Sequence, residues 1–172
     1  TLGIIHEDTL WGSDSGSTQN AMAEEKGYNV VGVKRRTSII STQRIDHIFN
    51  DPNFILEYGS MTDPGWMYRL LNKYKPDEIY NLAAQSHVKV SFECVEETSL
   101  RLLEAMRQEC PNAKFYQASS SEMFGDNPNF PQNEETVLMP ASPYACAKVF
   151  AHNLVRNYRH SYNLFCCSGI LF

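Results

Sequence analysis

Short apolar runs alternate with helix-forming segments along this chain, and that alternation constrains its fold more than any other feature. Runs typical of strands lie at residues 1–5, 28–33, 54–58, 78–82, 114–118 and 164–172. Helical patterns lie between them at residues 17–26, 64–73, 96–109 and from 142 onward. Strands that alternate with helices in this way form parallel sheets covered on both faces. The sequence therefore predicts an α/β fold with a doubly wound parallel sheet.

The composition fits one globular domain over residues 1–172, since 42% of the residues are hydrophobic and 20% are charged. A net charge of −5 argues against nucleic acid as the main partner. No segment reaches the ~18 apolar residues that a membrane span needs, and the N-terminus lacks a signal-peptide pattern. We therefore expect a cytoplasmic protein with no membrane contact.

Neither cysteines nor histidines show the spacing of a metal site. The five cysteines are an odd number without a Cys-x-x-Cys pair, and the five histidines are scattered. We expect reduced thiols and no bound metal.

Tyr144 and Lys148 form the first candidate catalytic pair. Ser142 is a good N-cap and Pro143 a good first helical residue, so a helix is expected to begin here. Residues four apart share a helix face, which places the Lys148 ammonium beside the Tyr144 phenol. A phenol titrates near 10, so a tyrosine base at neutral pH needs its phenolate stabilised by roughly 4 kcal/mol. A fixed positive charge can supply this, although an ordinary surface pair has the same spacing.

A loop of small residues lies between the first strand and the first helix. It contains Gly12, Ser13 and Gly16. A turn in this place brings backbone N–H groups and a helix N-terminus onto the pyrophosphate of a dinucleotide. The order of strand, turn and helix is that of a Rossmann-type dinucleotide site. The residues do not form Gly-x-Gly-x-x-Gly, so a loop that binds no phosphate is the alternative interpretation.

Two arginines at the end of the second strand bear on the choice of cofactor. Arg35 and Arg36 stand where the dinucleotide fold meets the adenosine ribose, and arginines there suit a 2′-phosphate. This favours NADP over NAD, with a solvated basic turn as the alternative interpretation.

Polar segments also follow the fourth and fifth strands. Ala83, Gln85 and Ser86 follow one, and Ser120 and Glu122 follow the other. Because open α/β sheets bind ligands at the carboxyl ends of their strands, we expect both segments to border the ligand.

Several longer strings resemble the GDP-mannose 4,6-dehydratase family, which belongs to the extended short-chain dehydrogenases/reductases. They are Lys34–Arg36, Arg44–His47, Pro76–Leu82, Gln85–Phe92, Phe115–Ser119, Ser121–Glu122 and Gly169–Phe172. The resemblance covers nearly the whole chain from Gly27 onward, and these strings extend beyond the motifs that all extended reductases share.

The resemblance implies a lyase that converts GDP-mannose to GDP-4-keto-6-deoxy-mannose, the precursor of GDP-fucose. Tyr144 would take the proton of the sugar 4-hydroxyl while C4 gives its hydride to NADP⁺, and Lys148 would hold the cofactor ribose. Glu122 would remove the C5 proton and assist the loss of water from C6, to which the hydride returns. Ser120, where the family usually has threonine, would hydrogen-bond the 4-oxygen.

The resemblance also implies further binding residues and a homo-oligomer. Ala83 and Gln85 join Gly12, Ser13, Gly16, Arg35, Arg36, Tyr144 and Lys148 as cofactor contacts. Ser86, Ser120 and Glu122 are the substrate contacts.

The sequence departs from the family pattern in four places. Ser13 and Leu10 stand where two glycines of the phosphate loop are expected, and Ser60 stands where the family usually has aspartate. About seven residues are missing between Phe92 and Leu100, close to two helical turns. The chain ends at about half the family's length, before most of the GDP-sugar pocket.

These departures leave other functions open. One is an inactive NADP-binding fragment, and another is a partner subunit that acts by association with a full-length enzyme. A sugar-nucleotide epimerase is a third, but it has no elimination step and so no need for the Glu122 carboxylate.

Overall fold

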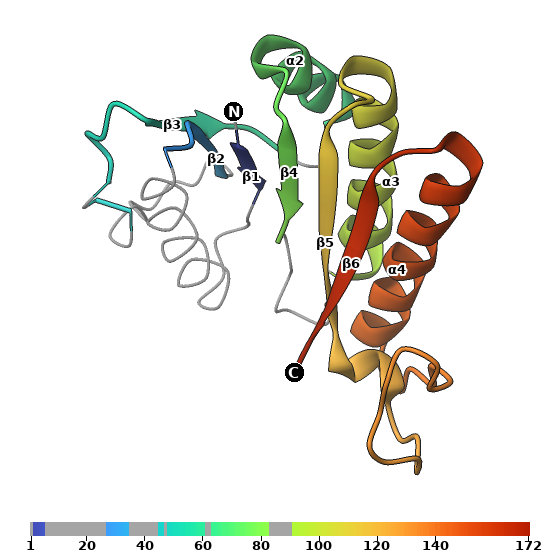
Figure 1. The fold of residues 1–172 in the computed structure, drawn as a ribbon. Coiled ribbons are helices and arrows are strands. Elements are labelled where there is room, and N and C mark those ends of the chain that lie inside the picture. The colour runs from blue at the N-terminus through green and yellow to red at the C-terminus, as the bar shows by residue number, and fades with distance from the viewer. Residues whose placement is uncertain (1, 6–26, 35–44, 47, 61–62, 83–90) are drawn as a thin grey trace.

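The computed structural model describes residues 2–5, 27–34, 45, 46, 48–60, 63–82 and 91–172 (Figure 1). Within them, six parallel strands form one sheet in the order β3-β2-β1-β4-β5-β6. The strands are β1 (Leu2–Ile5), β2 (Val30–Lys34), β3 (Phe54–Tyr58), β4 (Glu78–Asn81), β5 (Lys114–Ser120) and β6 (Cys166–Leu171). The order reverses between β1 and β4, which is the doubly wound Rossmann arrangement. The predicted α/β fold is confirmed.

Three α-helices of the described residues cover one face of this sheet (Figure 1). They are α2 (Pro64–Tyr74), α3 (Ser91–Glu109) and α4 (Pro143–Tyr162), and α3 packs against both of the others. A short 3₁₀ helix, η1 (Ser121–Phe124), follows β5 directly. None of the helices that the structure describes is long and apolar enough to cross a lipid bilayer.

Helices α2 and α4 begin where the sequence predicts, and an N-cap side chain fixes each beginning. Asp63 Oδ1 accepts a hydrogen bond from Trp66 N at 3.1 Å. Ser142 Oγ accepts one from Ala145 N, also at 3.1 Å. In both cases proline occupies the first helical position, where its missing N–H costs nothing.

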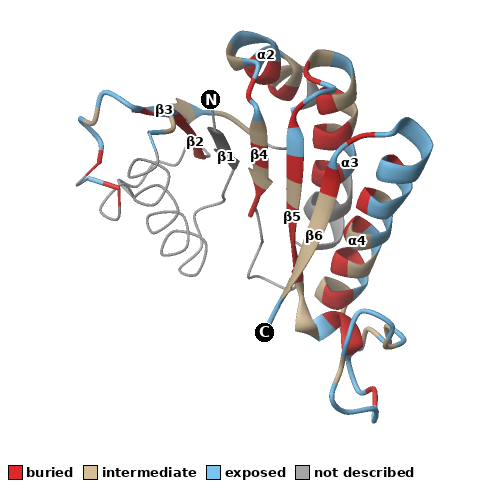
Figure 2. Ribbon diagram, viewed as in Figure 1, coloured by how far each residue is buried: buried red, intermediate tan, exposed pale blue. Residues whose placement is uncertain are grey.

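The core is divided by the sheet into two clusters. The larger lies between the sheet and α2, α3 and α4, and the buried residues of these helices face the strands (Figure 2). It contains Met67, Leu102, Leu103, Met106 and Phe115 among others. The smaller cluster includes Val30, Ile45, Phe54 and Ala118. Because alternate residues of a strand face opposite sides, Val30 and Val31 contribute to different clusters.

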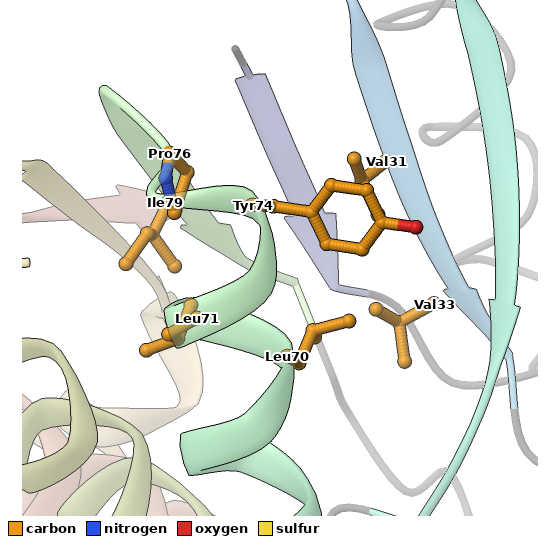
Figure 3. A pocket seen from close by; sticks show the side chains of 7 residues that line it. All are labelled: Val31, Val33, Leu70, Leu71, Tyr74, Pro76 and Ile79. Atoms are coloured by element: carbon orange, nitrogen blue, oxygen red, sulfur yellow. The ribbon is translucent and has the colours of Figure 1, made fainter. Parts of the chain in front are cut away.

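A small apolar cavity remains where α2 meets the sheet. Its lining comes from Val31, Val33, Leu70, Leu71, Tyr74, Pro76 and Ile79 (Figure 3). An apolar cavity this small offers water too few polar partners, so we interpret it as a packing defect and not as a ligand site.

Several predicted boundaries are wrong. Strand β5 continues past residue 118 to Ser120, because Ser119 and Ser120 pair with Ile170 and Leu171 of β6 despite their polar side chains. Helix α3 begins at Ser91 and not at residue 96. The boundaries of β3 are as predicted, and those of the remaining strands agree to within two residues.

Two apolar helix residues whose spacing from buried neighbours is typical of a core face are exposed. Leu100 of α3 is 40% exposed and Phe150 of α4 is 41% exposed. Other side chains of the same helices are buried, namely Leu102 and Ala105 on α3 and Ala147 and Ala151 on α4. Apolar spacing indicated a helix face correctly, but the face that meets the sheet is rotated away from these two side chains.

Candidate active site

The carboxyl end of β5, the helix η1 and the first turns of α4 meet at one edge of the sheet (Figure 1). Ser120 ends β5 and is also the N-cap of η1, with its Oγ accepting a hydrogen bond from Glu122 N at 3.2 Å. One side chain therefore fixes the direction in which the chain leaves the sheet. It places Ser120 and Glu122 on a single turn.

The loop after η1 is tied back to that turn. Gly125 adopts φ +53° and donates its N–H to the Glu122 carbonyl at 3.1 Å. Met139 N donates to the Met123 carbonyl at 3.0 Å, and Asn127 Nδ2 donates to the Val137 carbonyl at 2.7 Å. These bonds hold the two ends of the loop together, so η1 has a fixed position between β5 and α4.

Tyr144 and Lys148 lie on the first turns of α4, as the sequence predicts. Lys148 Nζ is 5.6 Å from the centroid of the Tyr144 ring. Lys148 is only 2% exposed, and its ammonium donates a hydrogen bond to the Ala118 carbonyl of β5 at 2.7 Å. Ala145, Ala147 and Ala151 are buried on the same helix, and such small side chains let α4 approach the sheet closely enough for this bond.

Burial dominates the titration of both residues. Burial lowers the pKa of Lys148 to about 8, while the charge of Glu122 acts in the opposite direction. Burial also raises the pKa of Tyr144, the Glu122 charge adds to this, and hydrogen bonding with the Ser120 side chain opposes it. The phenol is therefore favoured over the phenolate in this structure, whereas the sequence predicted a stabilised phenolate. The difference arises because burial of the phenol and the negative charge of Glu122 both disfavour the phenolate.

Glu122 is exposed, and its charge acts on both Tyr144 and Lys148. The structure thus brings together four residues that the sequence singled out as catalytic candidates, namely Ser120, Glu122, Tyr144 and Lys148. A carboxylate, a phenol, an ammonium and a hydroxyl within one small region provide the groups needed for proton transfer.

The other candidates lie outside the described residues. They are Gly12, Ser13, Gly16, Arg35, Arg36, Ala83, Gln85 and Ser86. Their roles stay predictions from the sequence.

Sequence reasoning missed a contact beside this site. The buried Ser119 Oγ lies 3.1 Å from His152 Nδ1, which links β5 to α4 one turn beyond Lys148. Burial lowers the pKa of His152, with a further contribution from Arg156 and Arg159. The spacing of His152 from Lys148 was the available signal, because residues four apart share a helix face.

Comparison with known proteins identifies the family of this sequence. The sequence model of the family described as "GDP-mannose 4,6 dehydratase" matches residues 15–172. This chain belongs to that family. The match begins after Leu10 and Ser13, the positions where the phosphate loop departs from the family pattern.

Curated relatives from distant organisms carry the same family name. A GDP-mannose 4,6-dehydratase of Vibrio cholerae is 52% identical over 161 residues, which cover 86% of this chain and 43% of that protein. The GDP-mannose 4,6 dehydratase of Homo sapiens is 46% identical over 164 residues, covering 86% of this chain and 44% of that protein. The chain therefore spans less than half the length of the family members it matches.

Solved structures confirm the fold at lower sequence identity. The dTDP-glucose 4,6-dehydratase of Bacillus anthracis, solved in complex with NAD, matches with a TM-score of 0.83 and 20% identity over 99% of this chain and 54% of that one. A UDP-glucose 4-epimerase of Brucella ovis, also in complex with NAD, matches with a TM-score of 0.80 and 19% identity over 100% of this chain and 52% of that one. Dehydratases and epimerases thus share this architecture, and the fold alone does not separate them.

Proposed function

We propose that this protein acts as a GDP-mannose 4,6-dehydratase and forms GDP-4-keto-6-deoxy-mannose for GDP-fucose synthesis. Family membership and the sequence identity to the relatives, 52% and 46% over 86% of this chain, support the substrate. The observation that carries the proposal is the position of Glu122, held by the Ser120 cap on the turn that faces Tyr144 and Lys148.

We further propose NADP as the cofactor. The sheet order reverses between β1 and β4, and the crevice at such a reversal is where doubly wound sheets bind dinucleotides. This crevice opens at the carboxyl edge of the sheet, where Tyr144 and Lys148 also lie. Their position therefore fits a dinucleotide bound at that edge. Lys148 would hold the ribose next to the nicotinamide, and Arg35 and Arg36 support the choice of a 2′-phosphate. When bound, the nicotinamide supplies a hydride acceptor and donor.

The side chains would divide the proton transfers between them. Tyr144, once deprotonated, would take the proton of the sugar 4-hydroxyl, and the Ser120 hydroxyl would bind the same oxygen. A ketone at C4 makes the C5 proton acidic, and the exposed Glu122 carboxylate would remove it. Glu122 would then deliver a proton to the departing C6 hydroxyl, which leaves as water. A carboxylate is suited to both steps because it can accept a proton and return it.

An epimerase is the second candidate, because a neighbouring fold carries that activity. Epimerisation inverts one centre without loss of water, so a carboxylate beside the tyrosine has no part in it. Glu122 therefore favours the dehydratase.

Two non-catalytic functions are further alternatives. One is NADP binding without turnover, and the other is association with a longer family member. Exposed apolar side chains of α3 and α4, Leu100 and Phe150, support association between subunits, and we propose a homo-oligomer. The described cysteines Cys110, Cys146, Cys166 and Cys167 are free, which suits the cytoplasmic location that we propose.

Mass spectrometry of the sugar nucleotide tests these functions together. The protein is incubated with GDP-mannose and NADP⁺, and the dehydratase proposal expects a product lighter by one water that is absent with Tyr144→Phe. An isomer of unchanged mass would support the epimerase. Cofactor binding by calorimetry without any product would support the inactive fragment, and light scattering with a full-length relative would detect mixed oligomers.

A further inference from the structure

A network of buried polar side chains adjoins the candidate pair and has no part in the roles proposed above. Asn81 at the end of β4, Ser99 of α3 and Gln117 of β5 are each 1% exposed or less. Asn81 Nδ2 donates to Gln117 Oε1 at 2.8 Å, and Ser99 Oγ donates to the same oxygen at 3.2 Å. Asn81 and Gln117 are also the last register pair between β4 and β5. The network therefore joins two strands and a helix at the carboxyl edge of the sheet.

These two bonds decide which way the Gln117 carboxamide points. Its oxygen is occupied by two donors, so its NH₂ group must face the other way. Gln117 Nε2 donates to the Ala118 carbonyl at 3.1 Å. The orientation of one glutamine side chain is thus set by contacts from β4 and α3.

The Ala118 carbonyl is the same oxygen that Lys148 binds. Lys148 Nζ donates to it at 2.7 Å, so both lone pairs of this oxygen have a donor. A lysine side chain has four rotatable bonds, and a single acceptor at a fixed place selects one of its many conformations. Whatever holds the Ala118 carbonyl therefore also holds the ammonium next to the Tyr144 ring.

The network is not the arrangement that would stabilise the core most. Among the described residues, the buried Asn81 Oδ1 has no hydrogen-bond donor, and an unpaired buried acceptor costs about 1–3 kcal/mol. Apolar side chains of similar size at such positions are often at least as stabilising as a partly satisfied polar network. A purely structural role accounts poorly for that cost, whereas a role in orienting a functional group accounts for it.

We propose that Gln117 is a positioning residue for Lys148, because its carboxamide, fixed by Asn81 and Ser99, holds the Ala118 carbonyl where the ammonium binds. This inference rests on the proposed function of Lys148 as the partner of Tyr144. It adds to that function a chain of contacts running from β4 and α3 to the reactive end of α4.

The titration of Lys148 measures this coupling without substrate or cofactor. Protein labelled with ¹³C at lysine Cε is titrated by NMR, and the Lys148 signal is assigned by its loss in Lys148→Arg. In Gln117→Met the pKa of Lys148 is expected to rise from about 8 by about one unit, a tenfold change in the dissociation constant. The carboxamide no longer holds the Ala118 carbonyl, so the ammonium can move toward solvent, where its charged form is favoured.

Tyr158→Phe is the matched control, because it removes one hydrogen bond of α4, to Glu104, without touching Lys148 or Ala118. Its Lys148 titration is expected to match that of the unaltered protein. If Gln117→Met fails to fold, Asn81→Ala replaces it, since this variant frees Gln117 Oε1 and also removes the unpaired oxygen. A rise in the Lys148 pKa is expected there as well, though a smaller one.

A Lys148 titration unchanged in the folded Gln117→Met or Asn81→Ala variant would overturn the inference and leave Gln117 a structural role only. Dehydration assays on the same proteins separate this failure from that of the proposed function. A shifted titration in a protein that forms no product would refute the dehydratase and retain the positioning contact. Product formation with an unshifted Lys148 titration would support the dehydratase and refute the positioning role of Gln117.

Discussion

The carbonyl oxygen of Met139 lies so close to Gly125 that a β-carbon at position 125 would stand 1.9 Å from it. Gly125 also adopts φ +53°, a conformation that side chains disfavour. Gly125→Ala is therefore expected to lower the free energy of unfolding by roughly 2–4 kcal/mol, and to displace the turn that carries Glu122.

Urea unfolding measures this change, with Gly27→Ala as the matched control. Gly27 has φ +75° but no described residue lies within 4 Å of an added β-carbon, so only the backbone cost of about 1 kcal/mol is expected. Equal losses of stability in the two variants would show that the Met139 backbone can move away from the added β-carbon at no cost in free energy.

Glu122→Gln separates the chemical role of the carboxylate from its place in the fold. The bond that fixes η1 runs from the backbone N–H of residue 122 to Ser120, so the substitution leaves it in place. We expect dehydration of GDP-mannose to fall by about 10²–10⁴-fold, the usual contribution of a general acid or base, with an unchanged melting temperature. Near-normal product formation by mass spectrometry would remove Glu122 from the mechanism.

The buried ammonium of Lys148 makes stability depend on pH in the alkaline range. Its pKa falls from 10.5 in the unfolded chain to about 8 in the folded protein, so the unfolded state binds more protons between these values. Stability therefore rises as pH increases from about 8 to 10.5, and below this range the buried charge costs roughly 3 kcal/mol.

Lys148→Met is expected to remove that dependence. At pH 7 it should raise the free energy of unfolding by about 1–2 kcal/mol, because loss of the Ala118 hydrogen bond offsets part of the gain. Thermal unfolding at pH 7 and pH 10 measures the difference in stability between the variant and the unaltered protein. A variant less stable at both values would contradict the assignment of a costly buried charge.

The contact between α3 and α4 should be sensitive to acid. Hydrogen bonding with Arg107, Gln108 and Tyr158 holds the pKa of Glu104 at about 2, where 4.5 is ordinary. A depressed pKa stabilises the folded state above the ordinary value, and this stabilisation is lost as pH falls from about 4.5 to about 2. Because the Glu104 side chain is 29% exposed, solvent reduces its contribution to about 1 kcal/mol.

Glu104→Gln should therefore be less stable than the unaltered protein at pH 6, and the gap should narrow toward pH 2. Chemical unfolding at several pH values measures it, with Glu135→Gln in the exposed loop as the control. A gap independent of pH would assign the effect to packing and not to the charge.

Local signals explain what could be predicted from the sequence. Asp63 with Pro64 and Ser142 with Pro143 determine where helices begin through bonds within a single turn, and both beginnings were predicted. The adjacency of Tyr144 and Lys148 follows from helix geometry alone. These features need no knowledge of the rest of the chain.

The remainder depends on partners distant in sequence. Leu100 and Phe150 have the spacing of core residues, but which side of a helix is buried depends on how it docks on the sheet. Gln117 reads as an ordinary strand residue until Asn81 and Ser99 are brought against it. The direction of the Lys148 ammonium likewise depends on the Ala118 carbonyl, which periodicity cannot indicate.

Two ion pairs of the described residues lie at the amino edge of the sheet, opposite the candidate site. Lys114 and Glu78 join the first residues of β5 and β4 at 3.0 Å, and Lys75 joins the end of α2 to Glu109 at the end of α3 at 3.1 Å. Distant, independent sites contribute additively to stability. Changes at the amino edge for heat or salt tolerance and changes to the candidate site at the carboxyl edge should therefore have additive effects on the free energy of unfolding, so the two can be designed separately.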